Sequence, residues 1–393
     1  MAKDVPIMRK RKKIAVVGAG IGGLVSALKL AHEGFEVKVF ERSEYPGGKI
    51  RTLEANSGPI NIGPTVLTML PIFQKLFREV GEDIFDHLEL KEQNILARHW
   101  WSDGTEFDLF TDKNNTFDEI RNVFGSNAAN QYMEFFHTTE KMFTCFEKPV
   151  MKTVSPAPIE ILKEICKTPT VIPALFPFRT LDKYLKSKFS EPKLQQLFGR
   201  YATYVGGSPL NSPALMALVW QAEAKGVWTV KGGISSVAKA IERLAEDRGV
   251  EFIYGHRVIE IQQSKHLVNK VCLDDGTNYE ADAIIFNGDP RALALGLLGE
   301  GLRKVTKKTR NTPRSLSANV WGFESKHVNK NLVHHNVFFS DEVNSEFYEI
   351  QKGKIPKDPT LYICAQDRDV SNEKQRTERF EIILNAPPLS KRK

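Results

Sequence analysis

Three glycines and one acidic residue near the start of the chain have the spacing of a nucleotide-binding turn. Gly18, Gly20 and Gly23 follow the apolar run at residues 14–17, and Glu41 ends a second apolar run. Gly18 permits a tight turn, Gly20 lets backbone approach a diphosphate, and Gly23 lets a helix pack closely on the strand. The start of that helix would offer free N–H groups to phosphate, and Glu41 would bind ribose hydroxyls. The pattern predicts a dinucleotide site on a βαβ unit.

A second glycine pair favours the flavin dinucleotide over the nicotinamide one. Gly47 and Gly48 follow the second strand closely and precede Lys49. Glycine N–H groups can face phosphate without a side chain in the way, and such a pair in two-domain flavoproteins lies along the diphosphate and ribitol. A nicotinamide enzyme has no need of this element, so we expect FAD. The alternative is a type II turn at residues 46–47.

Later segments can complete the same site. Residues 63–65 would bring backbone close to a flat ring, the backbone of residue 258 would grip the adenine edge, and residues 287–289 end an apolar strand at the carboxyl edge of the sheet. The predicted cofactor contacts are Gly18, Gly20, Gly23, Glu41, Arg42, Gly47, Gly48, Lys49, Gly63, Pro64, Thr65, Val258, Asn287 and Asp289.

Other elements must position a substrate beside this site. Residues 97–110 read as an aromatic hairpin about an Asp-Gly turn, and residues 116–221 read mostly as helices. Residues 160–167 and 181–189 are basic and amphipathic, and the apolar, proline-rich residues 169–178 between them cannot form one helix. Such a region suits the interface of a bilayer, and an ordinary helical subdomain with a buried linker fits it equally well.

Composition narrows the class of protein. The 393 residues contain 41% hydrophobic side chains and carry a net charge of +7, without a nucleic-acid motif, so we expect no nucleic acid partner. The four cysteines are scattered without metal spacing, which predicts reduced thiols and no metal site.

Residues 8–13 are basic and precede an apolar run, but that run contains glycines and Lys29, which argues against an export signal. No stretch approaches the ~20 apolar residues of a membrane span, and we expect a cytoplasmic protein with a short basic tail.

Taken together, the motifs resemble the phytoene desaturase type of carotenoid desaturase, and within it the hydroxycarotenoid 3,4-desaturase (methoxyneurosporene dehydrogenase) subgroup. The long match at residues 198–209 and 212–228 is the most specific. The other segments that carry the resemblance are residues 18–23, 46–49, 63–69, 97–104 and 283–289, and the whole resemblance spans about residues 12–388.

The resemblance implies an α/β fold in which a Rossmann-like FAD-binding domain holds an inserted substrate domain, made of a mixed sheet and a helical, membrane-facing part. The implied parts are FAD-binding residues 1–85 and 226–295, sheet residues 86–115 and 296–393, and helical residues 116–225.

It also implies an activity. An FAD enzyme on the inner face of the cytoplasmic membrane would introduce a C=C bond into an acyclic carotenoid by hydride transfer, with quinone or oxygen as electron acceptor. The polyene can delocalise positive charge, so no catalytic acid or base is assigned. His99, Arg200, Tyr201 and Tyr204 are interpreted as packing or salt-bridging residues.

The sequence departs from the family in two places. Asn61 stands where the family usually has an acid, and the glycine- and proline-rich segment that closes the flavin site is missing after residue 388. We therefore expect a truncated chain with weak FAD retention. The alternatives are an amine-oxidase-like flavoprotein acting on a soluble substrate, and an inactive remnant that binds lipid without turnover.

Overall fold

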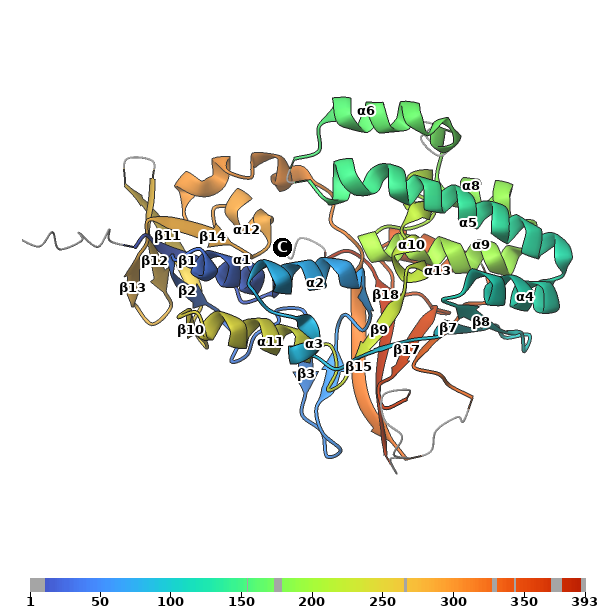
Figure 1. Cartoon of the computed structure of the whole chain (residues 1–393), viewed down its shortest axis with the longest axis horizontal. Coiled ribbons are helices and arrows are strands. Elements are labelled where there is room, and N and C mark those ends of the chain that lie inside the picture. Colours follow the sequence, from blue (N-terminus) through green and yellow to red (C-terminus); the bar gives the residue numbers. More distant parts are fainter. Residues whose placement is uncertain are drawn as a thin grey trace, which may run out of the picture.

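The computed structural model describes residues 11–153, 155–172, 179–264, 267–326, 331–342, 344–368 and 377–389. A mixed α/β part lies at one end of an elongated molecule, helices lie at the other, and a large sheet lies below those helices in the view of Figure 1. Most of the predicted basic tail, residues 8–10, and residues 173–178 of the proline-rich segment lie outside the described residues.

A parallel four-stranded sheet carries the predicted nucleotide-binding turn. Its strand order is β10 (Glu251–Ile253), β2 (Glu36–Phe40), β1 (Lys13–Val17) and β14 (Ala283–Phe286). One face of this sheet is covered by α1 (Ile21–His32) and α11 (Ser235–Glu246), which share a buried core with β1 and β2. The βαβ unit expected from the glycine spacing is therefore present.

The other face of the parallel sheet is covered by a meander. It consists of the antiparallel strands β11 (Val258–Ser264), β12 (Leu267–Leu273) and β13 (Asn278–Glu280). Next to it lie α12 (Pro290–Ala294) and the 3-10 turns Glu300–Lys304 and Lys307–Asn311. Val17 and Phe40 from the sheet, Val258 and Ile261 from the meander, and Leu302 belong to one buried cluster.

Two small sheets join this part to the rest of the molecule. β3 (Arg51–Leu53) pairs with β4 (Ile60–Ile62), while β9 (Val227–Val230) lies between β5 (Leu67–Thr68) and β6 (Leu90–Glu92). The helices α2 (Leu70–Glu79) and α3 (Ile84–His87) connect β5 to β6.

A six-stranded mixed sheet is assembled from distant parts of the sequence. Its order is β15 (Ser317–Ser325), β18 (Glu378–Ala386), β17 (Leu361–Ala365), β16 (His335–Phe338), β7 (Ile95–Trp100) and β8 (Glu106–Phe110). The β16–β7 pair is parallel and the other pairs are antiparallel, so the predicted hairpin β7–β8 is joined edge-on to the C-terminal strands. α13 (Ser345–Gln351) connects β16 to β17.

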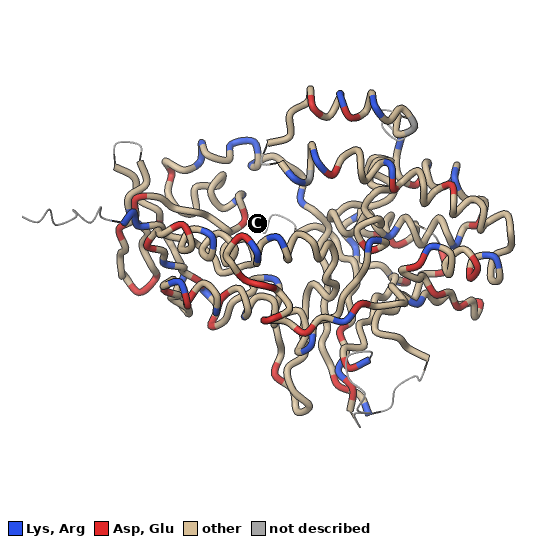
Figure 2. The backbone as a smooth tube through the Cα atoms, in the orientation of Figure 1, with Lys and Arg blue, Asp and Glu red and all other residues tan. Residues whose placement is uncertain are grey.

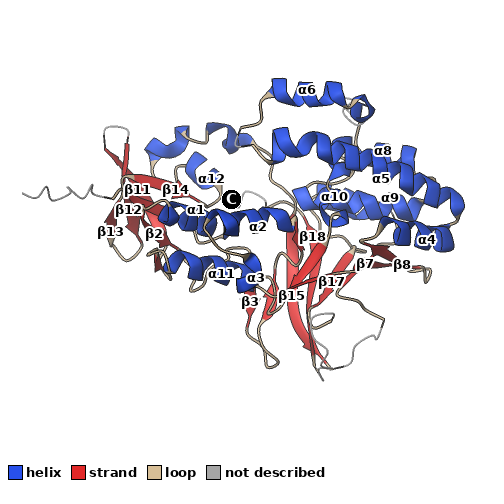
Figure 3. Cartoon of the chain, viewed as in Figure 1, coloured by secondary structure: helices blue, strands red, loops and turns tan. Residues whose placement is uncertain are grey.

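Helices cover one side of this sheet (Figure 3). They are α4 (Lys113–Phe124), α5 (Ser126–Phe146), α6 (Pro158–Lys167), α8 (Leu181–Lys188), α9 (Pro192–Gly199) and α10 (Gln221–Ala224), with short turns at Glu147–Met151, Pro169–Val171, Arg200–Val205 and Ala214–Leu218. The centre of the layer is aromatic, because Tyr132, Phe135, Phe198 and Trp220 are buried against one another.

Three observations concern the lengths of the helices, the distribution of charge and the cysteines. Within the described part of the chain, every helix is too short or too polar to span a bilayer. Lys and Arg are dispersed over the elements rather than gathered in one stripe (Figure 2). All four cysteines are free thiols, as the sequence predicts.

Candidate active site

The glycine turn after β1 leaves no room for side chains. Gly18 has φ +101°, and its N–H donates to the Phe40 carbonyl at 2.8 Å. A Cβ on Gly23 would lie 1.9 Å from the Gly18 carbonyl oxygen. Gly20 is the N-cap of α1, and no side chain of the described residues caps this helix start. The first-turn N–H groups of α1 are therefore left for an anion.

Glu41 lies directly beside this turn, at the end of β2. The side chain is 8% exposed, and its carboxylate accepts the Ala19 N–H at 2.8 Å and the Ser43 N–H at 3.0 Å. The remaining lone pairs can accept ribose hydroxyls. The neighbouring Arg42 is exposed. The Val258 side chain lies in the core, so only its backbone is available for an adenine edge.

The second glycine pair lies against the first turn. Gly47 forms a parallel bridge with Gly20, and its N–H donates to the Ala19 carbonyl at 2.9 Å. A Cβ on Gly48 would come within 3.0 Å of the Gly20 Cα. Gly48 itself is exposed, as is Lys49. Gly48 and Lys49 therefore form an exposed surface beside the start of α1.

The 63–65 segment lies next to the Gly47-Gly48 pair. A Cβ on Gly63 would lie 2.2 Å from the Lys49 carbonyl oxygen, so the 63–65 segment packs against the glycine-pair turn. Pro64 is exposed, and Thr65 Oγ1 shares a hydrogen bond with Tyr362 Oη at 2.6 Å. The structure thus brings the three predicted segments together and connects the last one to β17 of the large sheet.

Asn287 and Asp289 lie at different places. The Asn287 N–H donates to the Val17 carbonyl at 2.8 Å, and its side chain covers the turn so closely that a Cβ on Gly22 would be 2.5 Å from Nδ2. Asp289 instead caps α12 by accepting the Arg291 N–H at 2.9 Å, and it forms an ion pair with Arg314 at 3.6 Å. Asn287 therefore borders the glycine turn, whereas the Asp289 carboxylate is engaged by a helix start.

These features fit FAD. A side chain at Gly23 or Gly63 would collide with backbone, the start of α1 has free N–H groups, and Glu41 is held at the strand end. That combination suits the diphosphate and ribose of a dinucleotide. Asn61, the residue that replaces an acid, accepts the Ser235 N–H at the start of α11 at 3.2 Å. An amide can make this contact, so the replacement keeps the local connection.

Behind the 63–65 segment lies a group of polar side chains that we call the polar cluster, in which Tyr201, Glu223 and His335 are buried, Arg200 and Tyr362 are partly buried, and Tyr204 is 44% exposed. It consists of Arg200, Tyr201, Tyr204, Glu223, His335 and Tyr362. Glu223 is 3% exposed and accepts hydrogen bonds from the hydroxyls of Tyr201, at 2.6 Å, and Tyr204. The Arg200 guanidinium lies over both tyrosine rings, 5.2 and 5.7 Å from their centroids.

His335 forms the other half of the polar cluster. Its Nδ1 lies 2.7 Å from Tyr362 Oη, the hydroxyl that also contacts Thr65. Burial, with the neighbouring His334 and the Arg200 cation, holds the pKa of His335 well below its usual range. Burial likewise raises the pKa of Tyr362 well above its usual range. Both side chains are therefore neutral near neutral pH.

Two polar atoms of the cluster have no partner in the described part of the chain: Arg200 Nε and His335 Nε2. Each is buried, and an unsatisfied buried group of this kind costs about 1–3 kcal/mol. His99 is different. It is fully buried and stacks on Phe339 at 5.8 Å, and burial together with Arg200 lowers its pKa to about 3, so it is a packing residue.

His334, His335 and Cys364 place potential metal-ligating atoms within 4.8 Å of one another. The Cys364 thiol lies 3.5 Å from His334 Nε2. Burial raises the pKa of Cys364 far above its usual range, so the thiol is neutral in the structure as it stands.

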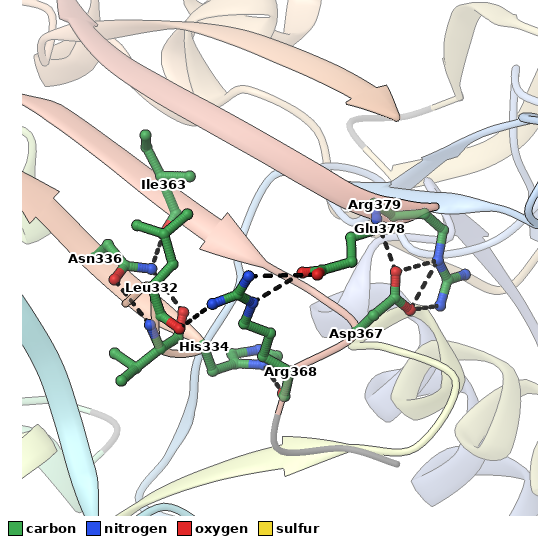
Figure 4. Close-up of polar contacts among 9 residues, drawn as sticks. Leu332, His334, Asn336, Ile363, Asp367, Arg368, Glu378 and Arg379 are labelled. Atoms are coloured by element: carbon green, nitrogen blue, oxygen red, sulfur yellow. Dashed lines mark hydrogen bonds and ion pairs between the residues drawn. The ribbon is translucent and has the colours of Figure 1, made fainter. Parts of the chain in front are cut away.

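Ion pairs fix the strands below the 63–65 segment (Figure 4). Arg368 Nε contacts Glu378 at 2.8 Å, and Arg379 forms a bidentate pair with Asp367, whose side chain is 5% exposed. Arg379 Nη1 also donates to the Pro59 carbonyl at 2.8 Å, just before β4. The large sheet therefore holds the chain that leads into Gly63.

Sequence reasoning missed most of the polar cluster. Arg200, Tyr201 and Tyr204 were interpreted as packing or salt-bridging residues, and their stacking and their contact with Glu223 agree with that. Glu223, His335 and Tyr362 come from α10, β16 and β17, and no spacing rule joins these elements. The only signal was their polarity within apolar surroundings.

Comparisons with known proteins agree with this site. Residues 21–321 match the family described as flavin containing amine oxidoreductase. The chain is 44% identical over 376 residues to a hydroxyneurosporene desaturase of Cereibacter sphaeroides, covering 96% of this chain and 76% of that protein. It is 32% identical over 388 residues to a 1-hydroxycarotenoid 3,4-desaturase of a Flavobacterium species, covering 96% of this chain and 77% of that protein. An oxidoreductase structure from Methanosarcina mazei shares the fold, with a TM-score of 0.65 and 15% identity over 96% of this chain and 79% of that one.

Proposed function

This chain belongs to the carotenoid desaturases of the flavin-containing amine oxidoreductase family, and we propose that it forms the C3=C4 bond of an acyclic 1-hydroxycarotenoid. The observation that carries the proposal is the continuous line of contacts from the start of α1, through the two glycine segments, to Thr65 and Tyr362 of the substrate side. It joins the FAD-binding segments to the large sheet and its helical cover.

FAD, when bound, supplies the hydride acceptor for the reaction. The residues of this chain would hold the dinucleotide, with the start of α1 at its diphosphate, Glu41 at its ribose and the 63–65 segment at its ring system. Behind Thr65, His335 and Tyr362 are neutral, and the Arg200 guanidinium lies over the ring of Tyr201, whose hydroxyl donates to Glu223. We therefore assign no general base, because an extended polyene can delocalise the positive charge that develops as hydride leaves. Electrons would leave to a quinone or to oxygen.

We also propose that the protein binds the inner face of the cytoplasmic membrane through α6. None of the described side chains of α6 is buried, although it carries isoleucine and leucine. Ile159 and Leu162 are 60% and 54% exposed, while Lys163 and Lys167 flank them and pair with Glu160 and Glu164. Figure 2 shows the mixed charges along this helix at the rim of the molecule. An exposed apolar ridge with lysines beside it suits an anionic bilayer interface.

A vesicle assay tests the activity. The protein is loaded with FAD and mixed with vesicles that contain an acyclic 1-hydroxycarotenoid with a saturated C3–C4 bond. We expect a product lighter by two hydrogen atoms with red-shifted absorption, and none from the same protein without FAD. Unchanged carotenoid, together with hydrogen peroxide formation from a soluble amine, would instead support the amine-oxidase-like alternative.

Sedimentation with vesicles tests the membrane proposal. The double variant Ile159→Ser, Leu162→Ser removes the ridge, and we expect at least ~5-fold less protein in the pellet with anionic vesicles. Leu267→Ser is the matched control, since this leucine is 74% exposed on β12. Equal sedimentation of both variants and the unaltered protein would refute the role of α6.

A further inference from the structure

The polar cluster is unusual for a protein whose proposed substrate is almost entirely hydrocarbon. An apolar chain needs only apolar walls, yet the His335 side chain and the Nε atom of Arg200 are buried behind the segment that is expected to face the flavin, where His335 contacts the partly buried Tyr362. Buried polar groups are normally hydrogen-bonded, and each exception asks for an explanation. A polar group on the substrate is one.

The hydrogen-bonding capacity of the polar cluster can be worked out from its contacts. If the Tyr362 hydroxyl donates to Thr65 Oγ1, then His335 Nδ1 carries the proton and donates to Tyr362. His335 Nε2 is then an acceptor, and it has no partner within the described residues. Arg200 Nε–H is a donor in the same situation. The cluster offers one free acceptor and one free donor.

An alcohol has the complementary groups: one O–H donor and an oxygen that accepts. We propose that the polar cluster binds the C1 hydroxyl of the carotenoid, with His335 Nε2 accepting its proton and Arg200 Nε–H donating to its oxygen. This inference rests on the proposed function and adds the group that determines substrate specificity.

The position of the cluster fits the chemistry of the substrate. In a 1-hydroxycarotenoid that is desaturated between C3 and C4, as the name of the Flavobacterium relative states, the hydroxyl carbon is two bonds from C3. A group that binds the hydroxyl must therefore lie next to the flavin. His335 meets this condition through Tyr362. The Tyr362 hydroxyl contacts His335 Nδ1 at 2.7 Å and lies 2.6 Å from Thr65 Oγ1 in the 63–65 segment.

The neutral state of His335 also fits an alcohol better than an anion. Burial, with His334 and Arg200, keeps this imidazole uncharged, so it offers no second positive charge, and its Nε2 accepts a hydrogen bond when Nδ1 carries the proton. Glu223 balances Arg200 through Tyr201 and Tyr204, which leaves little net charge for a carboxylate ligand. The cluster is built for a neutral polar group.

Binding is measured without turnover, by the quenching of tryptophan fluorescence in the full chain. Two probes are compared: an acyclic 1-hydroxycarotenoid and the same carotenoid without the hydroxyl. We expect the unaltered protein to bind the hydroxylated probe roughly 10-fold or more tightly, since a site that hydrogen-bonds a hydroxyl rejects an analogue that lacks it.

Two variants test the assignment. His335→Phe removes the acceptor, and the ratio of the two dissociation constants should fall to near one. Tyr362→Phe removes only the hydroxyl that orients His335, and the ratio should fall partway. Tyr184→Phe is the matched control, because its hydroxyl is also buried without a partner in the described chain but lies in α8. It should leave the ratio unchanged.

The outcomes separate this inference from the proposed function. A ratio near one in the unaltered protein, or a ratio that His335→Phe leaves intact, overturns the hydroxyl site even if desaturation occurs. If either variant weakens both probes equally, its side chain is structural and the assignment is wrong. Discrimination that is lost in the variants, in a protein that desaturates neither probe, supports the hydroxyl site and refutes the proposed function.

Discussion

Glu381 offers a sharp test of the electrostatics beside the flavin-facing segment. It lies on β18 with no exposed surface, and one carboxyl oxygen accepts the Gly63 N–H. The other oxygen has no partner in the described part of the chain. Burial raises the pKa of Glu381 from 4.5 to about 8, against the opposing effect of the Gly63 hydrogen bond. Replacing it with glutamine keeps an oxygen for Gly63 and removes the titration.

The sign and size of the effect follow from linkage. The folded-state pKa lies above the unfolded value, so the protonated carboxyl stabilises the fold at low pH. This contribution is present below pH 4.5 and is lost as the pH rises through about 8. A raised pKa is worth about 1.4 kcal/mol per unit, so the rise from 4.5 to about 8 corresponds to a loss of about 5 kcal/mol between acid and mildly alkaline pH. Glu381→Gln should abolish this part of the pH dependence.

Urea unfolding followed by circular dichroism, at several pH values from acid to mildly alkaline, measures the effect. The unaltered protein should lose about 5 kcal/mol more stability over this range than Glu381→Gln. Glu92→Gln is the control, because it removes a carboxylate from an exposed position on β6 and should leave the profile parallel to that of the unaltered protein. Parallel profiles for Glu381→Gln would show that the buried carboxyl is not protonated.

Three other substitutions probe the cofactor segments and the sheet that supports them. Gly23→Ala places a methyl group against backbone oxygen, and bound FAD, measured by absorbance after dialysis, should fall roughly 10-fold or more. Glu41→Gln weakens the charged hydrogen bonds at the strand end, and the dissociation constant for FAD in flavin fluorescence titrations should rise about 10-fold or more. Asp367→Asn leaves Arg379 without its charged partner and should lower stability to urea by about 3 kcal/mol, whereas the exposed Asp118→Asn should change it by under ~0.5 kcal/mol.

The sequence was sufficient for the elements that depend on local rules. The glycine turn requires Gly18, Gly20 and Gly23 for steric reasons that act within a few residues, and the structure has the expected strand, turn and helix there. The strand that leads to Glu41, Glu36–Phe40, and the apolar strand that ends before Asn287, Ala283–Phe286, are both present, because each is a short segment with apolar residues between turn residues. Membership of the carotenoid desaturases was also predicted from motifs and is confirmed.

The sequence was insufficient where distant elements meet. The large sheet joins β7 to β16 in parallel, a pairing of residues 98–100 with 336–338 that depends on how the helical layer packs. The same pairing brings His335 near the residues that follow α9. No periodicity encodes such a contact, since each strand alone satisfies its local rules. The buried acid Glu381 was likewise hidden within an apolar strand pattern.

The polar groups behind the 63–65 segment are mostly uncharged, which suits a reaction on an apolar polyene. His335, Tyr362, Cys364 and Glu381 all have pKa values shifted toward the neutral form at neutral pH, each chiefly by burial. His335, Cys364 and Glu381 are at most 2% exposed, so this part of the molecule is a dry interior. In such an interior a single hydroxyl is a strong anchor, because water does not compete for its partners. The same dryness would prevent water from attacking the carbon from which hydride leaves. Specificity for a hydroxylated end group and protection of the reacting carbon would then arise from one structural feature, the burial of His335, Cys364 and Glu381 away from water.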